Sequence, residues 1–155
     1  MKNNTKHLIK NLPGPKSYCN CNKLCSPLEL EHVMPEKVLI QKLQGNLLNK
    51  AFNDPHNIYN CCRKINRKKS YLIPIIQFKV HYFNGILSRS CLYMNDTYNL
   101  GFDMETINRW KVSSLLYEPS DSEIERSYLI STKTIYAANN YIRDYPYSCM
   151  THYHY

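Results

Sequence analysis

Residues 28–35 read LELEHVMP, and this stretch sets the first element of the expected fold. Its apolar and polar residues alternate with a period of two, so we expect a short strand over residues 28–33 that stops near Pro35. The strand ends close to an acid–histidine pair, Glu31-His32. Because neighbouring residues on a regular strand point to opposite faces, both side chains can serve one site only where the strand ends or bends.

The second informative stretch, residues 54–70, reads DPHNIYNCCRKINRKKS. Asp54-Pro55 predicts a turn, residues 56–59 a second short strand, and residues 62–70 a strongly basic helix. Helical spacing puts Asn66 on the same face as Cys62, Ile65 and Lys69. Asn66 is therefore expected to face the strands while its basic neighbours reach outward.

The three pieces EHVMP (31–35), DPHNI (54–58) and INRKKS (65–70) together resemble the His-Me finger, or ββα-metal, nuclease motif. The pattern is most similar to that of the endonuclease I family of non-specific nucleases, which runs Glu-His-Val-x-Pro, Asp-x-His-Asn-Leu and Asn-x-x-Arg-Ser. In that family the helical Asn lies twelve positions after the Asp, as Asn66 lies after Asp54.

Downstream, SRSCLYM at residues 88–94 is similar to the family's Ala-Arg-x-x-Leu-Tyr-Met helix, and the likeness covers about residues 28–145. Lys69 departs from the pattern, since the family has Arg there. Lysine keeps the charge but lacks the bidentate fork of a guanidinium.

The resemblance implies an α+β fold in which a ββα-metal (His-Me finger) core is embedded in a mostly helical single domain. It implies a metal-dependent endonuclease that hydrolyses phosphodiester bonds of DNA, with RNA as a second candidate substrate. Little sequence preference and 5′-phosphate ends are expected. By resemblance His32 is the general base, Arg89 a catalytic contact to the scissile phosphate, and Glu31 and Asn66 the metal ligands.

The residue types suit these roles. Mg²⁺ prefers a few carboxylate or amide oxygens and keeps several waters, so Glu31 and Asn66 form half of a coordination shell, and Mn²⁺ or Ca²⁺ can replace Mg²⁺ in binding. Histidine ordinarily titrates near neutrality, which suits His32 to proton abstraction. Nucleic-acid phosphates are expected to contact four cations of the basic helix: Arg63, Arg67, Lys68 and Lys69.

His56 and Asn57 are expected to support the site rather than to catalyse. The resemblance implies that Asn57 holds the loop between the strands by hydrogen bonding, while an Asx turn after Pro55 is the simpler interpretation. Simpler interpretations also exist for His32, as a partly buried structural histidine, and for the basic run, as a solvated helix face.

Charge is unevenly distributed along the chain. Residues 1–80 contain 14 Lys and Arg against four Asp and Glu, whereas residues 81–155 contain six against eight. The net charge of +8 therefore comes from the first half. This asymmetry favours a polyanionic partner, either nucleic acid or an anionic membrane surface, with a solubilising charge excess as the alternative.

The remaining elements follow from periodicity and capping residues. We expect a helix or irregular helical loop over residues 36–48 and helices over 86–98, 103–116 and 122–141. Asn99-Leu100-Gly101 predicts a C-terminal cap for the first of these three helices. In the second, four residues are expected to face inward: Met104, Ile107, Trp110 and Leu115.

One nuclease domain is expected over residues 17–145, between a flexible N-terminal arm (1–16) and a C-terminal tail (146–155). The longest apolar run, residues 71–76, is far short of the roughly 20 residues that cross a bilayer. The N-terminus shows no secretory h-region. We therefore expect an intracellular protein, in a virion or host cytoplasm among other settings, with an exported mature form as the alternative. Its abundant Asn, Lys, Ile and Tyr fit an AT-rich genome, such as a viral one.

Seven cysteines leave several chemistries open. Five of them can form a thiolate zinc site, disulfides or buried thiols: Cys19, Cys21, Cys25, Cys61 and Cys62. The Cys-x-Cys-x₃-Cys spacing departs from a standard zinc knuckle, so structural Zn²⁺ is not favoured. A thiol hydrolase built on Cys25 and His32 lacks an orienting third group in the sequence and is not favoured either.

Two other functional classes remain open from the sequence. One is a non-catalytic basic nucleic-acid-binding or packaging protein on the same fold, and the other is a zinc-structured interaction module. The oligomeric state and the biological target of cleavage are not indicated. Degradation of plasmid DNA with Mg²⁺, abolished by EDTA, separates the nuclease from both alternatives.

Overall fold

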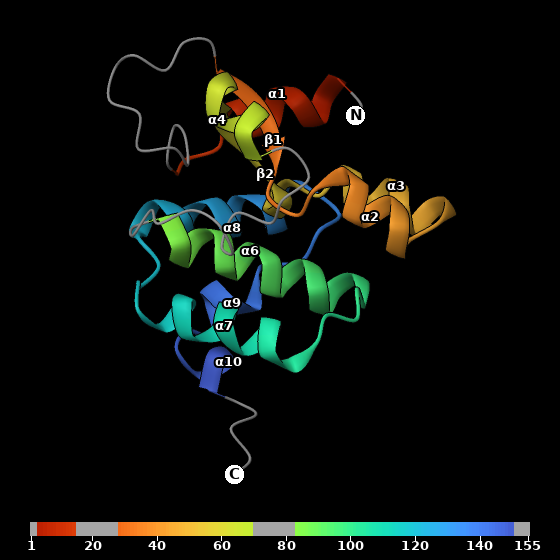
Figure 1. Cartoon of the computed structure of the whole chain (residues 1–155). Coiled ribbons are helices and arrows are strands. Elements are labelled where there is room, and N and C mark those ends of the chain that lie inside the picture. Colours follow the sequence, from red (N-terminus) through yellow and green to blue (C-terminus); the bar gives the residue numbers. More distant parts are fainter. Residues whose placement is uncertain (1–2, 15–27, 70–82, 151–155) are drawn as a thin grey trace.

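The computed structural model describes residues 3–14, 28–69 and 83–150, with the backbone alone for residues 3–6, 65, 68, 69 and 83. These ranges form one two-stranded sheet and a set of helices, which confirms the expected α+β class. In Figure 1 the sheet lies beside α1 and α4 at one end of the molecule, and α6 to α10 fill the other end.

The strands form an antiparallel pair. β1 (Leu28–His32) pairs with β2 (Ile58–Cys62), and the register places Glu31 opposite Tyr59 and Glu29 opposite Cys61. The helix α4 (Arg63–Lys69) begins directly after β2 and packs against both strands. Two strands and a following helix therefore occur in the expected order, with β1 one residue shorter than predicted.

The second strand lies later in the chain than predicted. Residues expected to start it instead form the 3₁₀ helix η1 (Pro55–Asn57), and the strand begins at Ile58. The side chain of Asp54 accepts a hydrogen bond from the backbone N–H of His56 at 2.9 Å, which caps this turn. Cys62 consequently ends β2 instead of starting the basic helix.

Between the strands, the expected helical segment is divided into α2 (Glu36–Lys42) and α3 (Gly45–Phe52). The break falls at Leu43 and Gln44, which have extended backbone conformations. The helices pack against each other, and Figure 1 shows them beside the end of the sheet. The first residue of α2 and the last of α3 lie next to the end of β1.

The helix α6 (Phe83–Tyr98) forms the centre of the core and packs against α3, η1, α7 and α9. It ends as predicted: Asn99 has φ 48°, and the N–H of Leu100 donates to the carbonyl of Asn95 at 3.0 Å. This is a Schellman cap, and the buried side chain of Leu100 packs into the core beside it.

The helix α7 (Met104–Leu115) has Asp103 as its N-cap and buries Trp110, as expected. The expectation for Met104 is wrong, because its side chain is exposed. Met104 lies six positions before Trp110, which at 3.6 residues per turn is about a third of a turn away from the buried face.

Three other sequence-based boundaries are corrected. The predicted N-terminal arm contains α1 (Asn3–Asn11), which contacts β2 and buries Ile9. The helix α8 (Asp121–Lys133) has Ser120 as its N-cap and ends eight residues before Tyr141. After α9 (Asn140–Arg143), the predicted tail forms α10 (Tyr147–Met150), which buries Cys149.

No helix within the described ranges has both the length and the apolar character needed to cross a membrane.

Candidate functional site

His32 lies at the last position of β1, held between α2 and α3. Its Nε2 lies 2.9 Å from the backbone oxygen of Phe52, and its Nδ1 lies 3.2 Å from Oε1 of Glu36. Since a carbonyl oxygen only accepts hydrogen bonds, the first contact requires a proton on Nε2. The ring is thus fixed in position and in its protonation at Nε2.

Asn57 connects the end of η1 to the loop that follows β1. Its Oδ1 accepts from the backbone N–H of Met34 at 2.6 Å, and its Nδ2 donates to the Met34 carbonyl at 3.1 Å. Met34 and Asn57 are both fully buried. Asn57 therefore holds the loop after β1 by two side-chain hydrogen bonds.

A second cluster joins β1 to α4. Arg63 Nε donates to Oε1 of Glu29 at 2.5 Å, and Asn66 Nδ2 donates to Oε2 of the same carboxylate at 3.3 Å. The hydrogen bond from Arg63, together with that from Asn66, lowers the pKa of Glu29. Glu29 is therefore ionised and binds two side chains of the helix.

The structure brings Asn66 to Glu29, two positions before the predicted ligand Glu31. Alternation along β1 places the side chains of Glu29 and Glu31 on the same face of the strand. Sequence analysis missed Glu29, although its position two residues before Glu31 was a usable signal. It also missed Glu36 and the Phe52 carbonyl, because these contacts depend on how α2 and α3 fold back toward β1.

The donor atoms around Asn66 suit a hard cation. Glu29, Glu31 and Asn66 offer only carboxylate and amide oxygens, which are the ligands that Mg²⁺ prefers. Among the described residues there is no group of three or more His, Cys, Asp and Glu side chains arranged to bind a metal. An ion at β1 and α4 would therefore need the amide oxygen of Asn66 and water as further ligands.

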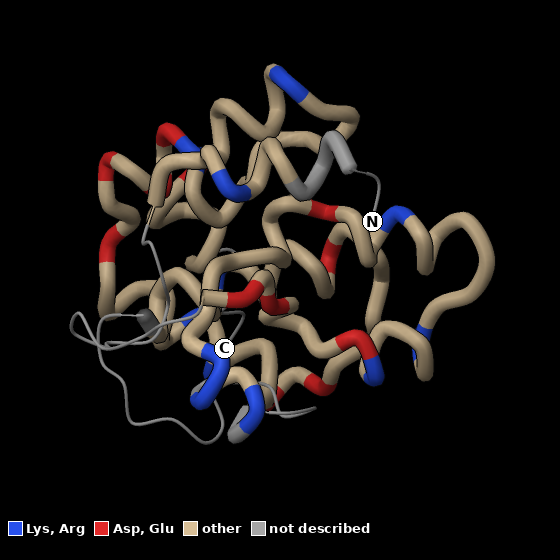
Figure 2. Tube along the Cα trace, turned by 90° about the horizontal axis from the view of Figure 1, so that it is seen from above, with Lys and Arg blue, Asp and Glu red and all other residues tan. Residues whose placement is uncertain are grey.

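The basic helix presents cations to solvent. Arg63, Lys64 and Arg67 are exposed on α4, and Arg63 also pairs with Glu29. The side chains of Lys68 and Lys69, which were expected to contact phosphates, lie outside the described part of the structure. Figure 2 shows Lys and Arg distributed around the described trace with Asp and Glu between them. The run of exposed cations on α4 is therefore a local feature of the described residues.

Arg89 is not brought to this site. Its guanidinium is 1% exposed and forms two hydrogen bonds of 2.7 Å with the carboxylate of Glu123. It also donates to the carbonyl oxygens of Ser114 and Tyr117, at 3.2 and 2.6 Å. A phosphate could reach Arg89 only if this buried pair opened, so the structure corrects the expected phosphate contact to a structural ion pair.

His56 is buried in η1 and makes structural contacts. Its Nε2 donates to the carbonyl of Ala137 at 2.9 Å, and burial lowers its pKa to about 4. The ring packs against Tyr93, with centroids 4.5 Å apart. A neutral, buried His56 therefore ties η1 to the segment after α8.

Asp54 anchors the same turn to α6. Besides the N–H of His56, its carboxylate accepts from the hydroxyls of Tyr98 at 2.7 Å and Tyr93 at 3.1 Å. Burial raises the pKa of Asp54 to about 6, although these hydrogen bonds oppose the shift. Asp54 thus serves folding here, because it fixes η1 and through it Asn57.

Four cysteines belong to the described residues, and all are buried: Cys61, Cys62, Cys91 and Cys149. Cys19, Cys21 and Cys25 lie outside the described residues.

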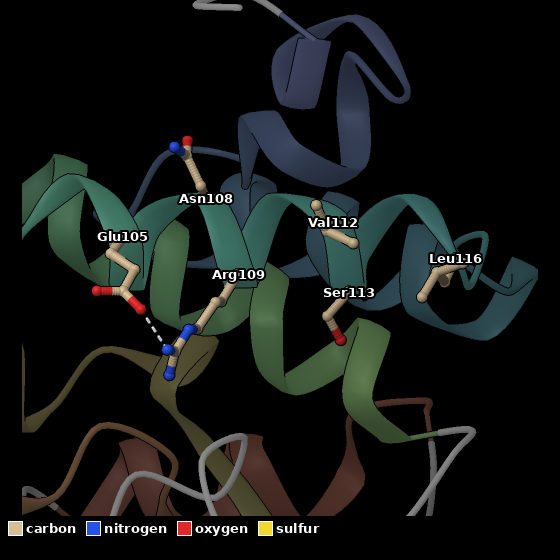
Figure 3. A pocket seen from close by; sticks show the side chains of 6 residues that line it. All are labelled: Glu105, Asn108, Arg109, Val112, Ser113 and Leu116. Atoms are coloured by element: carbon tan, nitrogen blue, oxygen red, sulfur yellow. Dashed lines mark hydrogen bonds and ion pairs between the residues drawn. The ribbon is translucent and has the colours of Figure 1, made fainter.

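A pocket of about 390 Å³ lies along α7, away from the predicted residues. Figure 3 shows Glu105 and Arg109 pointing toward each other on this helix, with Val112 and Leu116 further along it. None of the side chains proposed for catalysis or metal binding lines this pocket.

A scan against protein-family models and a search of curated proteins found no match for this sequence. The resemblance to the endonuclease I family is therefore carried by the sequence motifs alone.

Proposed function

We propose that this chain is a Mg²⁺-dependent endonuclease that hydrolyses phosphodiester bonds of DNA with little sequence preference and leaves 5′-phosphate ends. RNA is the second substrate to test. The proposal rests on the ββα-metal interpretation of β1, β2 and α4, with His32 as general base and Glu31 and Asn66 as metal ligands.

The observation that carries the proposal is the hydrogen bond between His32 Nε2 and the Phe52 carbonyl. With the proton held on Nε2, the neutral imidazole has its lone pair on Nδ1 once the contact of Nδ1 with the Glu36 carboxylate, which needs a proton on Nδ1, has opened. A general base needs such a fixed acceptor atom to take a proton from water. The Phe52 carbonyl orients the ring for this role.

Glu36 must move for His32 to work in this way, because its carboxylate lies 3.2 Å from Nδ1. The Glu36 side chain is 62% exposed, so it can turn into solvent without breaking the core. We therefore expect the contact to open when substrate and water occupy the site.

Glu31 directly precedes His32 on β1, and Asn66 lies on α4, which packs against the same strand. A divalent cation held by Glu31 and Asn66 would neutralise the scissile phosphate and stabilise the leaving oxygen. Asn66 lies on α4, so the same helix that supplies this ligand also presents Lys64 and Arg67 to the phosphate backbone. The helix α4 would thus contribute to both metal binding and DNA binding.

The test compares wild-type protein with His32→Ala in cleavage of supercoiled plasmid DNA with Mg²⁺ and with EDTA. Wild type should cleave only with the metal. General-base catalysis contributes about 10²–10⁴-fold, so His32→Ala should lose that much rate while its DNA affinity, measured in Ca²⁺, stays unchanged. His7→Ala, which changes an exposed histidine on α1, is the matched control and should cleave as wild type does.

Full activity in His32→Ala would refute the assignment of the base. Absence of cleavage with any divalent metal, combined with salt-sensitive DNA binding, would favour the alternative of a non-catalytic nucleic-acid-binding or packaging protein. The exposed cations Lys64 and Arg67 are compatible with that alternative, since phosphate contacts alone supply non-specific affinity.

A further inference from the structure

We propose that Glu29 is a positioning residue for the metal site: it binds the amide nitrogen of Asn66 and so leaves the amide oxygen to coordinate the cation. This inference rests on the proposed function, because it concerns the ligand Asn66. It assigns to Glu29 a role that the sequence motifs do not give it.

The chemistry of the two groups fixes the orientation of the amide. A carboxylate only accepts hydrogen bonds, so the Asn66 atom that faces Glu29 Oε2 must be the nitrogen, which lies 3.3 Å away. The oxygen Oδ1 is the other branch of the same planar group and is directed away from that contact. An amide turned the other way would face the carboxylate with its oxygen, and the two acceptors would repel.

Glu29 is itself held in place by the first residue of α4. Arg63 Nε binds Oε1 at 2.5 Å while Asn66 binds Oε2, so each oxygen of the carboxylate has a different partner on the helix. The Glu29 side chain is 31% exposed and the Arg63 side chain 47%, so the pair lies at the edge of the sheet. Arg63 therefore fixes the carboxylate that orients Asn66.

An asparagine that binds a metal ion needs its amide to be held in one orientation. An asparagine can rotate its amide, and only one of the two orientations presents oxygen to a cation. Outer residues that orient a ligand typically change metal affinity by about 10–100-fold when they are replaced. Glu31, on the same face of β1, would supply the carboxylate beside the amide oxygen.

The test measures Mn²⁺ affinity by calorimetry, without substrate, for wild type, Glu29→Gln, Asn66→Ala and the double variant. Glutamine retains a single acceptor oxygen and cannot hold both Arg63 and Asn66. We expect Glu29→Gln to weaken Mn²⁺ binding about tenfold in the wild-type background. In the Asn66→Ala background the same change should alter affinity by less than about twofold, because the side chain through which Glu29 acts is missing.

Two controls accompany this double-mutant cycle of Glu29 and Asn66. Glu125→Gln makes the same change of charge at an exposed position of α8 and should leave Mn²⁺ affinity unchanged. In the metal-free protein, the side-chain amide resonances of Asn66 should shift in Glu29→Gln, and thermal unfolding should show that each variant is folded.

The outcomes separate the possible roles. Equal weakening by Glu29→Gln in both backgrounds would make Glu29 a ligand and overturn the positioning role. Unchanged affinity in Glu29→Gln would overturn the inference and leave the proposed nuclease standing. A wild-type protein that binds no Mn²⁺ would refute the metal site of the proposed function, and the inference with it.

Discussion

Asn57 and Met34 form a closed pair of hydrogen bonds across 23 residues of sequence: the amide of Asn57 accepts from the Met34 N–H and donates to the Met34 carbonyl. The adjoining residue Val33 also donates to the Asn57 backbone oxygen at 2.8 Å. A side chain thus continues the pairing of β1 and β2 where the strands end. His32 lies directly before this closed loop.

Asn57→Ala is expected to lower the free energy of unfolding by about 2–4 kcal/mol, because it leaves two buried backbone groups of Met34 without partners. Urea unfolding followed by circular dichroism measures the loss. Asn108→Ala removes an exposed asparagine from α7 and should change stability by less than about 0.5 kcal/mol. A loss in Asn57→Ala no larger than in this control would contradict the role of the pair.

Arg89→Met is expected to destabilise the protein by about 3–5 kcal/mol, since it leaves the carboxylate of Glu123 buried without its cation. Replacing both residues, with Arg89→Met and Glu123→Leu, should recover most of that loss because neither charge of the pair then remains. Chemical unfolding of the two variants gives the comparison. If the double variant folds and still cleaves DNA, Arg89 does not contact the scissile phosphate.

Asp54 and His56 are expected to make opposite contributions to the pH dependence of stability. Burial raises the pKa of Asp54 from 3.8 to about 6, so its contribution favours folding below pH 4 and is lost as the pH rises through 6. Burial lowers the pKa of His56 from 6.5 to about 4, so its contribution is present above pH 6.5 and is lost as the pH falls through 4. Between pH 4 and 6 the two slopes oppose each other.

Two single-residue variants should separate the contributions of Asp54 and His56 to the pH dependence of stability. Asp54→Asn should lose up to about 3 kcal/mol of stability on acidification from pH 6.5 to 4, because the slope from His56 is then no longer opposed by that from Asp54. His56→Gln, whose side-chain amide can still donate to the Ala137 carbonyl, should instead gain stability on acidification. Urea unfolding at a series of pH values measures these changes. If the free energy of unfolding depended on pH in the same way in both variants, this account would be contradicted.

The salt dependence of DNA binding should report the phosphate contacts of α4. Each phosphate neutralised contributes about −0.9 to the slope of log K against log salt, so Arg67→Ala should flatten the slope by about one for every duplex sequence. Lys133→Ala, at the exposed end of α8, is the control and should keep the wild-type slope. A salt-independent affinity would contradict nucleic-acid binding through this helix.

Local patterns in the chain were sufficient for several elements. Alternation in LELEH identified β1, since a half-buried strand repeats every two residues. Asn99 and Gly101 after a helical stretch identified the end of α6, because the left-handed conformation found at both positions suits Asn and Gly. The helical spacing of residues 62–69 also placed Asn66 on a helix that follows a strand. These features depend on neighbours within a few residues.

The partners of the charged residues were decided by tertiary packing. Arg89 meets Glu123 only because α6 and α8 pack together, and their 34-residue separation carries no periodic signal. Asn66 meets Glu29 because the antiparallel register brings the start of α4 beside the early part of β1. The helix α1 forms in a polar segment because Ile9 is buried in contacts that exist only once the distant β2 is in place.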